Sequence, residues 1–131
     1  MKIKPIILVS GEPKSIFFEI FFKSLKKVKL KSPIILICSK NDLSKQIKKF
    51  SFKKKIKHLK IKDFHNQEID NKVINLINVD YKKSKNQKLR FKLQNKYINN
   101  CFNIAFKMIK SGYTYKFING PINKKTFLSK R

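Results

Sequence analysis

Short apolar runs alternate with amphipathic segments along the chain, and this alternation predicts alternating strands and helices. The apolar runs cover residues 3–9, 34–38, 73–79 and 115–118, while residues 56–61 alternate apolar and polar side chains. Short runs rich in β-branched residues are typical of strands buried within a sheet. Alternation is typical of a strand with one face in water. We therefore predict five strands.

Helices are predicted between these strands. The first is capped by Ser15, ends near Lys27 and contains IFFEIFF at residues 16–22, which is apolar nearly all round and predicts a helix buried within the fold. The second is capped by Asn41 or Asp42 and ends near Phe50. Residues 63–72 are polar, so we expect a loop there.

The clearest helical periodicity follows residue 86. Apolar side chains recur every three or four positions over residues 97–108, and Gly112 suits the position just after the helix. A last helix is predicted from Lys124 onward. Strands alternating with helices indicate an α/β protein with a largely parallel sheet. We find no internal repeat and no second domain boundary, so residues 1–131 are interpreted as one α/β portion.

The net charge of +26 suggests a nucleic-acid-binding protein, but the kind of basic residue argues against it. Of 33 basic residues only Arg90 and Arg131 are arginine, whose planar fork reads phosphates and guanines. Lysine is spread over the whole chain beside abundant Ile, Asn and Phe, which indicates compositional bias. Nucleic acid is therefore disfavoured as a partner, and a small lysine-rich nucleic-acid-binding α/β domain is kept as the alternative.

The remaining composition favours a cytoplasmic protein. Cys38 and Cys101 are far apart and fall on apolar faces, as reduced core cysteines do. The apolar run after MKIK is too short for a secretory signal, because it meets Gly11-Glu12-Pro13 at once. No segment approaches the roughly 18–20 apolar residues of a membrane span, so we expect no membrane partner.

Two junctions at strand ends are the best candidates for chemistry. ILVSGEPKSIFFEI at residues 7–20 and KFINGPINKKTF at 116–127 each lead from a strand through a Gly/Pro turn into a helix. Ligands of open α/β proteins bind at the carboxyl ends of strands. The candidate residues of the two turns are Gly11, Glu12, Pro13, Gly120, Pro121 and Lys124.

Each charged candidate has a structural alternative. Glu12 is either a cleft residue or a turn acid favoured by the helix dipole. Lys124 is either an anion-facing lysine at a helix N-terminus or one more surface lysine. His58 and His65 have no metal-ligand spacing and are interpreted as solvated histidines. Neither a phosphate-loop motif nor G-x-G-x-x-G is present, so an NTPase or an ordinary Rossmann site is unsupported.

The first junction resembles the amino-terminal signature of the 4-hydroxythreonine-4-phosphate dehydrogenases, T-x-G-[DE]-P-A-G-I-G-P-E. The matching residues are Gly11, Glu12, Pro13, Ile16 and Glu19. Ser15, Phe17 and Phe18 depart from that pattern. A phenylalanine cannot take a positive φ without cost, so we expect a reshaped loop or an earlier helix start.

The second junction is similar to that family's [TA]-[GA]-P-[IV]-x-K-x-x-[IFL] segment, except at Asn119. The matching residues are Gly120, Pro121, Ile122, Lys124 and Lys125. The two motifs stand in the family's order and spacing, so the resemblance covers the whole chain.

The resemblance implies a three-layer α/β/α fold like that of isocitrate and isopropylmalate dehydrogenases, here incomplete. It implies an oxidoreductase that oxidises and decarboxylates 4-phosphooxy-L-threonine with NAD, in vitamin B6 biosynthesis. It also implies a divalent metal (zinc, magnesium or cobalt) and a homodimer that binds this phosphorylated amino acid.

The family's G-H-T segment, metal-binding histidines and phosphate-holding residues find no match before Arg131. We therefore assign no catalytic or metal-binding residue. We expect an amino-terminal portion that is inactive in isolation. A flavodoxin-like module binding a phosphate-bearing ligand at the first turn is a weaker alternative.

Overall fold

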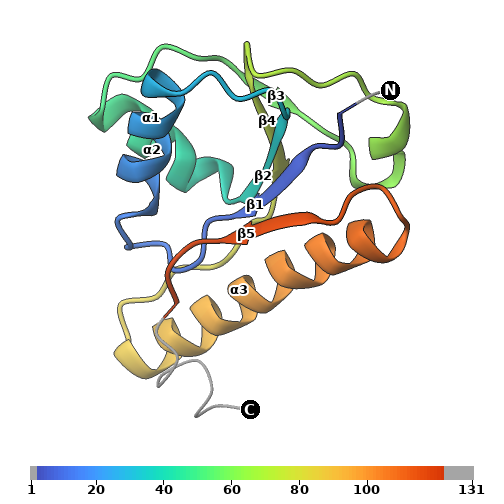
Figure 1. The fold of residues 1–131 in the computed structure, drawn as a ribbon. Coiled ribbons are helices and arrows are strands. Elements are labelled where there is room, and N and C mark those ends of the chain that lie inside the picture. Colours follow the sequence, from blue (N-terminus) through green and yellow to red (C-terminus); the bar gives the residue numbers. More distant parts are fainter. Residues whose placement is uncertain (1–2, 123–131) are drawn as a thin grey trace.

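The computed structural model describes residues 3–122, with the backbone alone at residues 63–65. Its elements follow one another as strands and helices in alternation (Figure 1). They are β1 (Ile6–Val9), α1 (Phe17–Lys27), β2 (Ile34–Cys38), α2 (Lys40–Lys49), β3 (Ile56–His58), the 3₁₀ helix η1 (Ile61–Asn66), β4 (Ile74–Asn78), α3 (Gln87–Lys110) and β5 (Lys116–Asn119). The five predicted strands are therefore all present.

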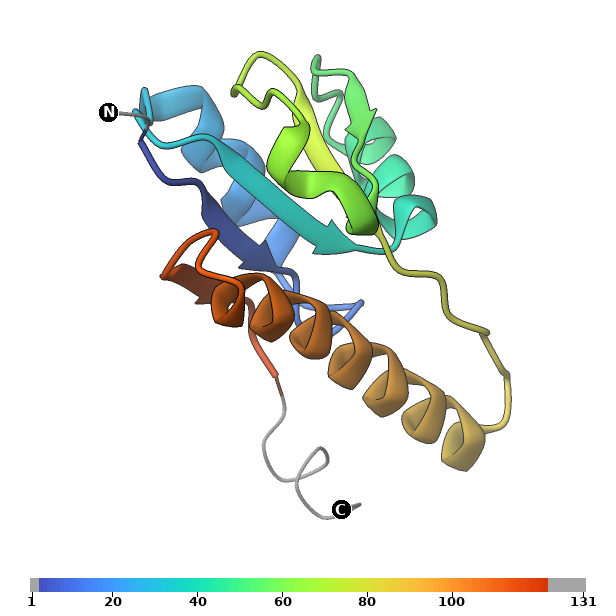
Figure 2. The ribbon, with the colours of Figure 1, turned by 90° about the vertical axis from the view of Figure 1, so that its right-hand side faces the viewer.

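The strands form one sheet in the order β3-β4-β2-β1-β5, and all four pairings are parallel. β1 lies between β2 and β5, so Ile6 is in register with both Ile34 and Lys116. The first and last strands are therefore neighbours, and the turns that follow them leave the same end of the sheet (Figure 2).

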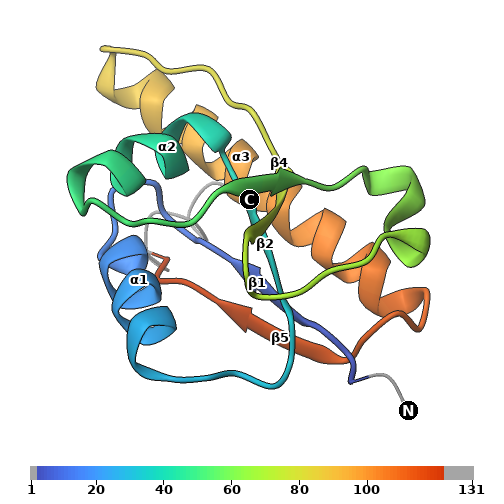
Figure 3. The same cartoon turned by 90° about the horizontal axis from the view of Figure 1, so that it is seen from above.

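The helices cover the sheet on both faces, because the direction of chain travel reverses. The connections from β1 to β2 and from β2 to β3 run toward one edge, whereas that from β4 to β5 runs toward the other. Parallel crossovers are right-handed in nearly all proteins, so the reversal moves the helix to the opposite face. α1 and α2 accordingly cover one face and α3 the other (Figures 1 and 3). The predicted three-layer α/β/α architecture is confirmed.

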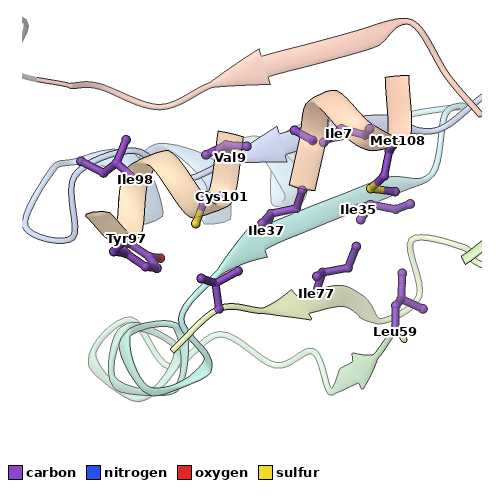
Figure 4. Close-up of a cluster of buried hydrophobic side chains, with 12 residues drawn as sticks. Ile7, Val9, Ile35, Ile37, Leu59, Ile77, Tyr97, Ile98, Cys101 and Met108 are labelled. Carbon is purple, nitrogen blue, oxygen red and sulfur yellow. The ribbon is translucent and has the colours of Figure 1, made fainter. Parts of the chain in front are cut away.

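Each sheet face contributes to its own apolar core, as the two-residue period of a strand requires. Ile7, Ile35 and Ile77 face α3, whereas Leu8 and Leu36 face α1 and α2. Figure 4 shows the α3 side of the sheet, with Tyr97, Ile98, Cys101 and Met108 of the helix directed at the strands. Cys38 and Cys101 are both buried free thiols, which confirms their prediction as core residues.

The segment IFFEIFF is buried on one side only. Phe17, Phe18, Phe21 and Phe22 all lie in the core. Ile20, in the same helix, is 52% exposed. The prediction of a helix buried within the fold therefore holds for the phenylalanines and is wrong for the side that carries Ile20.

Three local predictions need correction. The N-cap of α2 is Ser39, whose side chain accepts a hydrogen bond from the Asp42 amide at 3.3 Å, so the cap is neither Asn41 nor Asp42. The strand predicted over residues 56–61 ends at His58. The predicted loop at 63–72 begins within η1, because the chain turns helical at Ile61 before returning to β4.

Candidate functional site

The turn after β1 places its candidate residues at the carboxyl end of the sheet. Ser10 is buried, and Gly11 has a φ of +78°, a left-handed conformation that favours glycine. The Ser15 amide donates to the Glu12 carbonyl at 3.1 Å, which closes the turn around Pro13. Glu12 and Pro13 are partly exposed, so both reach the surface of this edge.

The departures from the family pattern are accommodated by the start of α1. Phe17 and Phe18 are the first two residues of the helix, and both are buried. Ser51 is the only non-glycine residue with a positive φ across residues 3–122, so neither phenylalanine is strained. The prediction that Ser15 caps this helix is wrong: the N-cap residue is Ile16, whose side chain makes no cap, and Ser15, one position earlier, accepts a hydrogen bond from the Phe17 amide at 3.3 Å. The helix therefore begins where the family pattern has its last glycine.

The two turns pack directly against each other. The Gly120 amide donates to the Val9 carbonyl at 2.6 Å, and the Glu12 amide donates to the Pro121 carbonyl at 2.9 Å. A Cβ on Gly11 would lie 2.7 Å from the Gly120 carbonyl carbon, and one on Gly120 would lie 2.8 Å from the Phe17 ring. Both glycines are therefore required by close backbone approach, and they hold the two motifs together.

The structure thus brings together four of the six sequence candidates: Gly11, Glu12, Gly120 and Pro121. Pro13 lies on the same turn as Glu12 but makes no bond to the second turn among those the structure records. Lys124 and the helix predicted from it lie outside the described residues, so that helix and a cleft shared by Glu12 and Lys124 stay predictions. His58 is exposed at the end of β3, as expected for a solvated histidine.

A second polar group, which sequence reasoning missed, lies at the carboxyl ends of β2 and β4. Asp42 is only 7% exposed, and its carboxylate accepts from the Tyr81 hydroxyl at 2.6 Å and from the Lys83 ammonium at 3.1 Å. We call these three residues the Asp42 cluster. The only sequence signal was an acid in the first turn after an apolar strand, since its partners lie about 40 residues further along.

In the Asp42 cluster, hydrogen bonding and charge hold Tyr81 and Lys83 against the Asp42 carboxylate. Burial, with the bond to Asp42, raises the pKa of Tyr81, so its hydroxyl stays protonated and donates. Hydrogen bonding to and repulsion by Lys83 lower the pKa of Lys45, which lies beside it. The segment after β4 is thereby fixed against the start of α2. β2 and β4 send their helices to opposite faces, so this is a topological switch point of the sheet.

Tyr97 completes the polar lining of this sheet end. Its hydroxyl accepts from the Ser39 amide at 2.8 Å, and its ring lies 4.4 Å, centroid to centroid, from that of Tyr81. Burial raises the pKa of the Tyr97 hydroxyl, which therefore remains neutral. α3 is thus tied to the same edge that carries the two turns.

The described residues do not fit a metal centre. Across residues 3–122, leaving aside the side chains at 63–65, no group of three or more His, Cys, Asp or Glu could hold an ion. Within the same part of the chain, none of the helices combines the length and hydrophobicity needed to cross a bilayer.

These observations define the class: an open, parallel α/β/α sheet in which the glycine turns after β1 and β5 pack against each other at the carboxyl edge. No family model and no curated protein sequence matches the chain. Its structure is similar to that of 4-hydroxythreonine-4-phosphate dehydrogenase from Klebsiella pneumoniae, with a TM-score of 0.74 and 20% identity over 97% of this chain and 40% of that one. The enzyme of the same name from Burkholderia phymatum has a TM-score of 0.74 and 15% identity over 99% of this chain and 40% of its own.

The chain therefore spans about 40% of the length of these dehydrogenases. At 15–20% identity the likeness establishes the fold, since a fold alone does not fix an activity. The resemblance expected from the two motifs is confirmed at that level.

Proposed function

We propose that this chain is the amino-terminal portion of an enzyme like 4-hydroxythreonine-4-phosphate dehydrogenase. That enzyme would oxidise and decarboxylate 4-phosphooxy-L-threonine with NAD, as a step of vitamin B6 biosynthesis. The single observation that supports this most is the packing of the Gly11 turn against the Gly120-Pro121 turn. The two turns carry the two family motifs, and they meet on a fold that those dehydrogenases share.

In this proposal the described part of the chain contributes the two turns that line one side of the substrate cleft. The hydrogen bonds between the turns fix Glu12 and Pro121 at one edge of the sheet, where an open α/β protein binds its ligand. We propose that Glu12 and Pro13 face a bound phosphorylated amino acid, and that Lys124 adds positive charge from the second turn. The donor set of the described residues does not fit a divalent metal, so the metal ligands would come from other residues of the cytoplasmic homodimer.

The nucleotide sequence after codon 131 tests the proposal first. A reading frame that continues into a G-H-T segment and further histidines supports the assignment. A stop codon with no such segment nearby contradicts the assignment to an active enzyme and leaves only the fold.

Activity tests it next. We expect the isolated 131-residue chain to show no NAD reduction with 4-phosphooxy-L-threonine and a divalent metal, measured by absorbance. The whole reading frame should support growth without pyridoxine in a bacterium that lacks the dehydrogenase. Robust turnover by the 131-residue chain would contradict the proposal that this chain lines the cleft but lacks the catalytic and metal-binding residues.

A matched pair of variants in the whole reading frame locates the site. Glu12→Gln should lower turnover at least tenfold, because it removes the acid from the turn that faces the cleft. Glu68→Gln changes an exposed acid far from both turns and should leave turnover unchanged. Equal activity of the two variants would remove Glu12 from the site.

A further inference from the structure

The Asp42 cluster holds a second lysine at its open side. Lys83 donates to the Asp42 carboxylate at 3.1 Å, and the Lys83 side chain is 52% exposed. Lys45 follows Asp42 by three residues on α2, so the two side chains project from the same side of that helix. A hydrogen bond joins the side chains of Lys83 and Lys45. Two lysine amines therefore meet beside one buried acid.

The hydrogen bond between the two lysines defines their protonation states. An ammonium group has three donors and no acceptor, so one partner of such a bond must be the neutral amine. The bonds to Lys45 and to Asp42 raise the pKa of Lys83. The bond to Lys83 and its positive charge lower the pKa of Lys45. Lys83 is therefore the ammonium that donates, and Lys45 is the amine that accepts.

The anchoring of Asp42 distinguishes this pair from the lysines dispersed over the chain. Asp42 is 7% exposed, and the Tyr81 hydroxyl donates to its other carboxylate oxygen at 2.6 Å. The ion pair of Lys23 with Glu19, by contrast, is exposed on both sides. Exposed ion pairs contribute little, because water screens them. Lys83 is instead held by a buried carboxylate whose position is fixed.

We propose that Lys45 is an amine nucleophile that forms Schiff bases with small aldehydes, and that Lys83 supplies the proton for the carbonyl oxygen. Lys45 is exposed, so an aldehyde reaches its Nζ atom from solvent. A neutral lysine beside a second cationic group is an activated nucleophile for a carbonyl carbon. α2 follows the carboxyl end of β2, the edge at which open α/β proteins bind ligands. The inference does not depend on the proposed dehydrogenase activity.

The reaction is an addition followed by the loss of water. The lone pair of Lys45 Nζ forms a bond to the aldehyde carbon, while the carbonyl π pair moves to the oxygen, which takes a proton from Lys83. The Lys45 nitrogen then returns one proton to Lys83, which gives a neutral carbinolamine. Next the nitrogen lone pair forms the C=N bond, and the hydroxyl group leaves as water with a second proton from Lys83. The iminium nitrogen restores that proton to Lys83, so the net products are an imine and one water, and nothing is oxidised or reduced.

The experiment measures which lysine reacts with 4-carboxybenzaldehyde in the protein expressed from the whole reading frame. Borohydride traps each imine as a stable secondary amine, and chymotrypsin releases a peptide of residues 44–50. That peptide carries both Lys45 and Lys48, which is also exposed on α2, so tandem mass spectrometry compares the two within one molecule. At about pH 7 an ordinary lysine is almost entirely protonated. We expect Lys45 to be labelled at least fivefold faster than Lys48 at that pH.

Matched variants of two adjacent lysines test the part played by Lys83. Lys83→Gln should slow the labelling of Lys45 to the rate of Lys48, because it removes the ammonium that donates to Lys45. Lys82→Gln changes the neighbouring exposed lysine and should leave that labelling unchanged. Asp42→Asn should raise the labelling of Lys83 at least threefold, because the carboxylate no longer stabilises its ammonium form. Circular dichroism of each variant checks that the fold is retained.

Three results would overturn the proposal. They are equal labelling of Lys45 and Lys48 in the unmodified protein, labelling of Lys45 that Lys83→Gln leaves unchanged, and equal slowing by Lys83→Gln and Lys82→Gln. The first would show that Lys45 reacts as an ordinary surface lysine, and the other two would show that Lys83 does not activate it. The first comparison is made within the unmodified protein, so it decides the matter even where a variant does not fold.

Discussion

The three glycines of the chain are needed for two different reasons, a left-handed backbone conformation or a lack of space for a side chain. Gly112 has a φ of +82° and open space around its Cβ position, so only its backbone conformation favours glycine. The φ of Gly120 is not left-handed, but a side chain there would meet the Ser10 carbonyl and the Phe17 ring. Gly11 combines both constraints. The packing of the two turns therefore depends on Gly11 and Gly120, which the sequence alone identifies only as turn-forming residues.

Alanine substitutions should rank in that order. Gly112→Ala should lower the free energy of unfolding by about 1 kcal/mol, from left-handed strain alone. Gly120→Ala should cost about 1–3 kcal/mol, because the backbones of the two turns must separate. Gly11→Ala should cost the most. Urea unfolding followed by circular dichroism measures all three, and a Gly120→Ala protein as stable as wild type would contradict the close packing.

Buried thiols and phenols make the fold sensitive to alkali. Burial raises the pKa of Cys101 to about 12 and raises that of Cys38 as well. The folded state therefore favours the protonated thiols. Their contribution to stability is complete below the unfolded thiol pKa of about 8.5 and is lost as pH rises from there through the folded pKa.

Stability should accordingly fall between about pH 8.5 and 12, by roughly 1.4 kcal/mol per pH unit for each buried thiol. Cys101→Ala should make that fall shallower, because the unfolded state then has one thiol fewer to ionise. The slope of unfolding free energy against pH is the measurement, since the alanine cavity shifts all values equally. An unchanged slope in the variant would show that burial does not raise the pKa of Cys101.

At the scale of elements, the hydrophobic pattern located every strand but not every boundary. Ile34–Cys38 was predicted with its bounds, because a run buried on both faces is unambiguous. The prediction of Asn41 or Asp42 as the cap of α2 was wrong, because the cap is Ser39, which is buried and lies directly after the strand. Local preferences cannot show which of several polar residues has its oxygen at the helix end.

The cap assignment is testable by substitution. Ser39→Ala should lower the free energy of unfolding by about 1 kcal/mol, through loss of the bond from the Asp42 amide. Asn41→Ala is the control; it should be neutral or slightly stabilising, because alanine is the better helix former at an exposed position. Thermal denaturation of both variants decides the matter. A larger loss of stability for the Asn41 variant would favour Asn41, one of the two caps predicted from the sequence.

The candidate site was predicted in part, for a similar reason. The Gly/Pro turns were recognisable because strand–turn–helix junctions have a local signature. The Asp42 cluster was not, because Tyr81 and Lys83 lie in a charged segment and meet Asp42 only through the sheet. A hydrophobic pattern does not predict the order of strands in the sheet, and so it cannot predict contacts between distant residues that depend on that order.

At the scale of the whole molecule, the positive charge comes from lysines that are spread along the chain around an ordinary α/β/α core. The basic residues include only two arginines, so bidentate recognition of phosphates or bases is nearly absent. Lysines on all sides attract polyanions without selecting a groove or sequence. Any affinity for nucleic acid should then be weak and governed by salt.

A mobility-shift series with duplex DNA tests this. Each phosphate contact contributes about 0.9 to the slope of log affinity against log salt. We expect retardation at roughly 20 mM salt and none near 150 mM, close to physiological ionic strength. A specific complex that survives at about 150 mM would favour the nucleic-acid-binding alternative.

The neighbouring position of β1 and β5 also sets the order in which the sheet can be built during synthesis. Residues 6 and 116 pair in the finished sheet, about 110 positions apart. A ribosome adding roughly 5–20 residues per second completes β2 about 80 residues before β5, and so leaves one edge of β1 unpaired for some 4–16 s. An unpaired strand edge invites aggregation. The nascent chain thus carries an open, Ile-rich edge until β5 emerges.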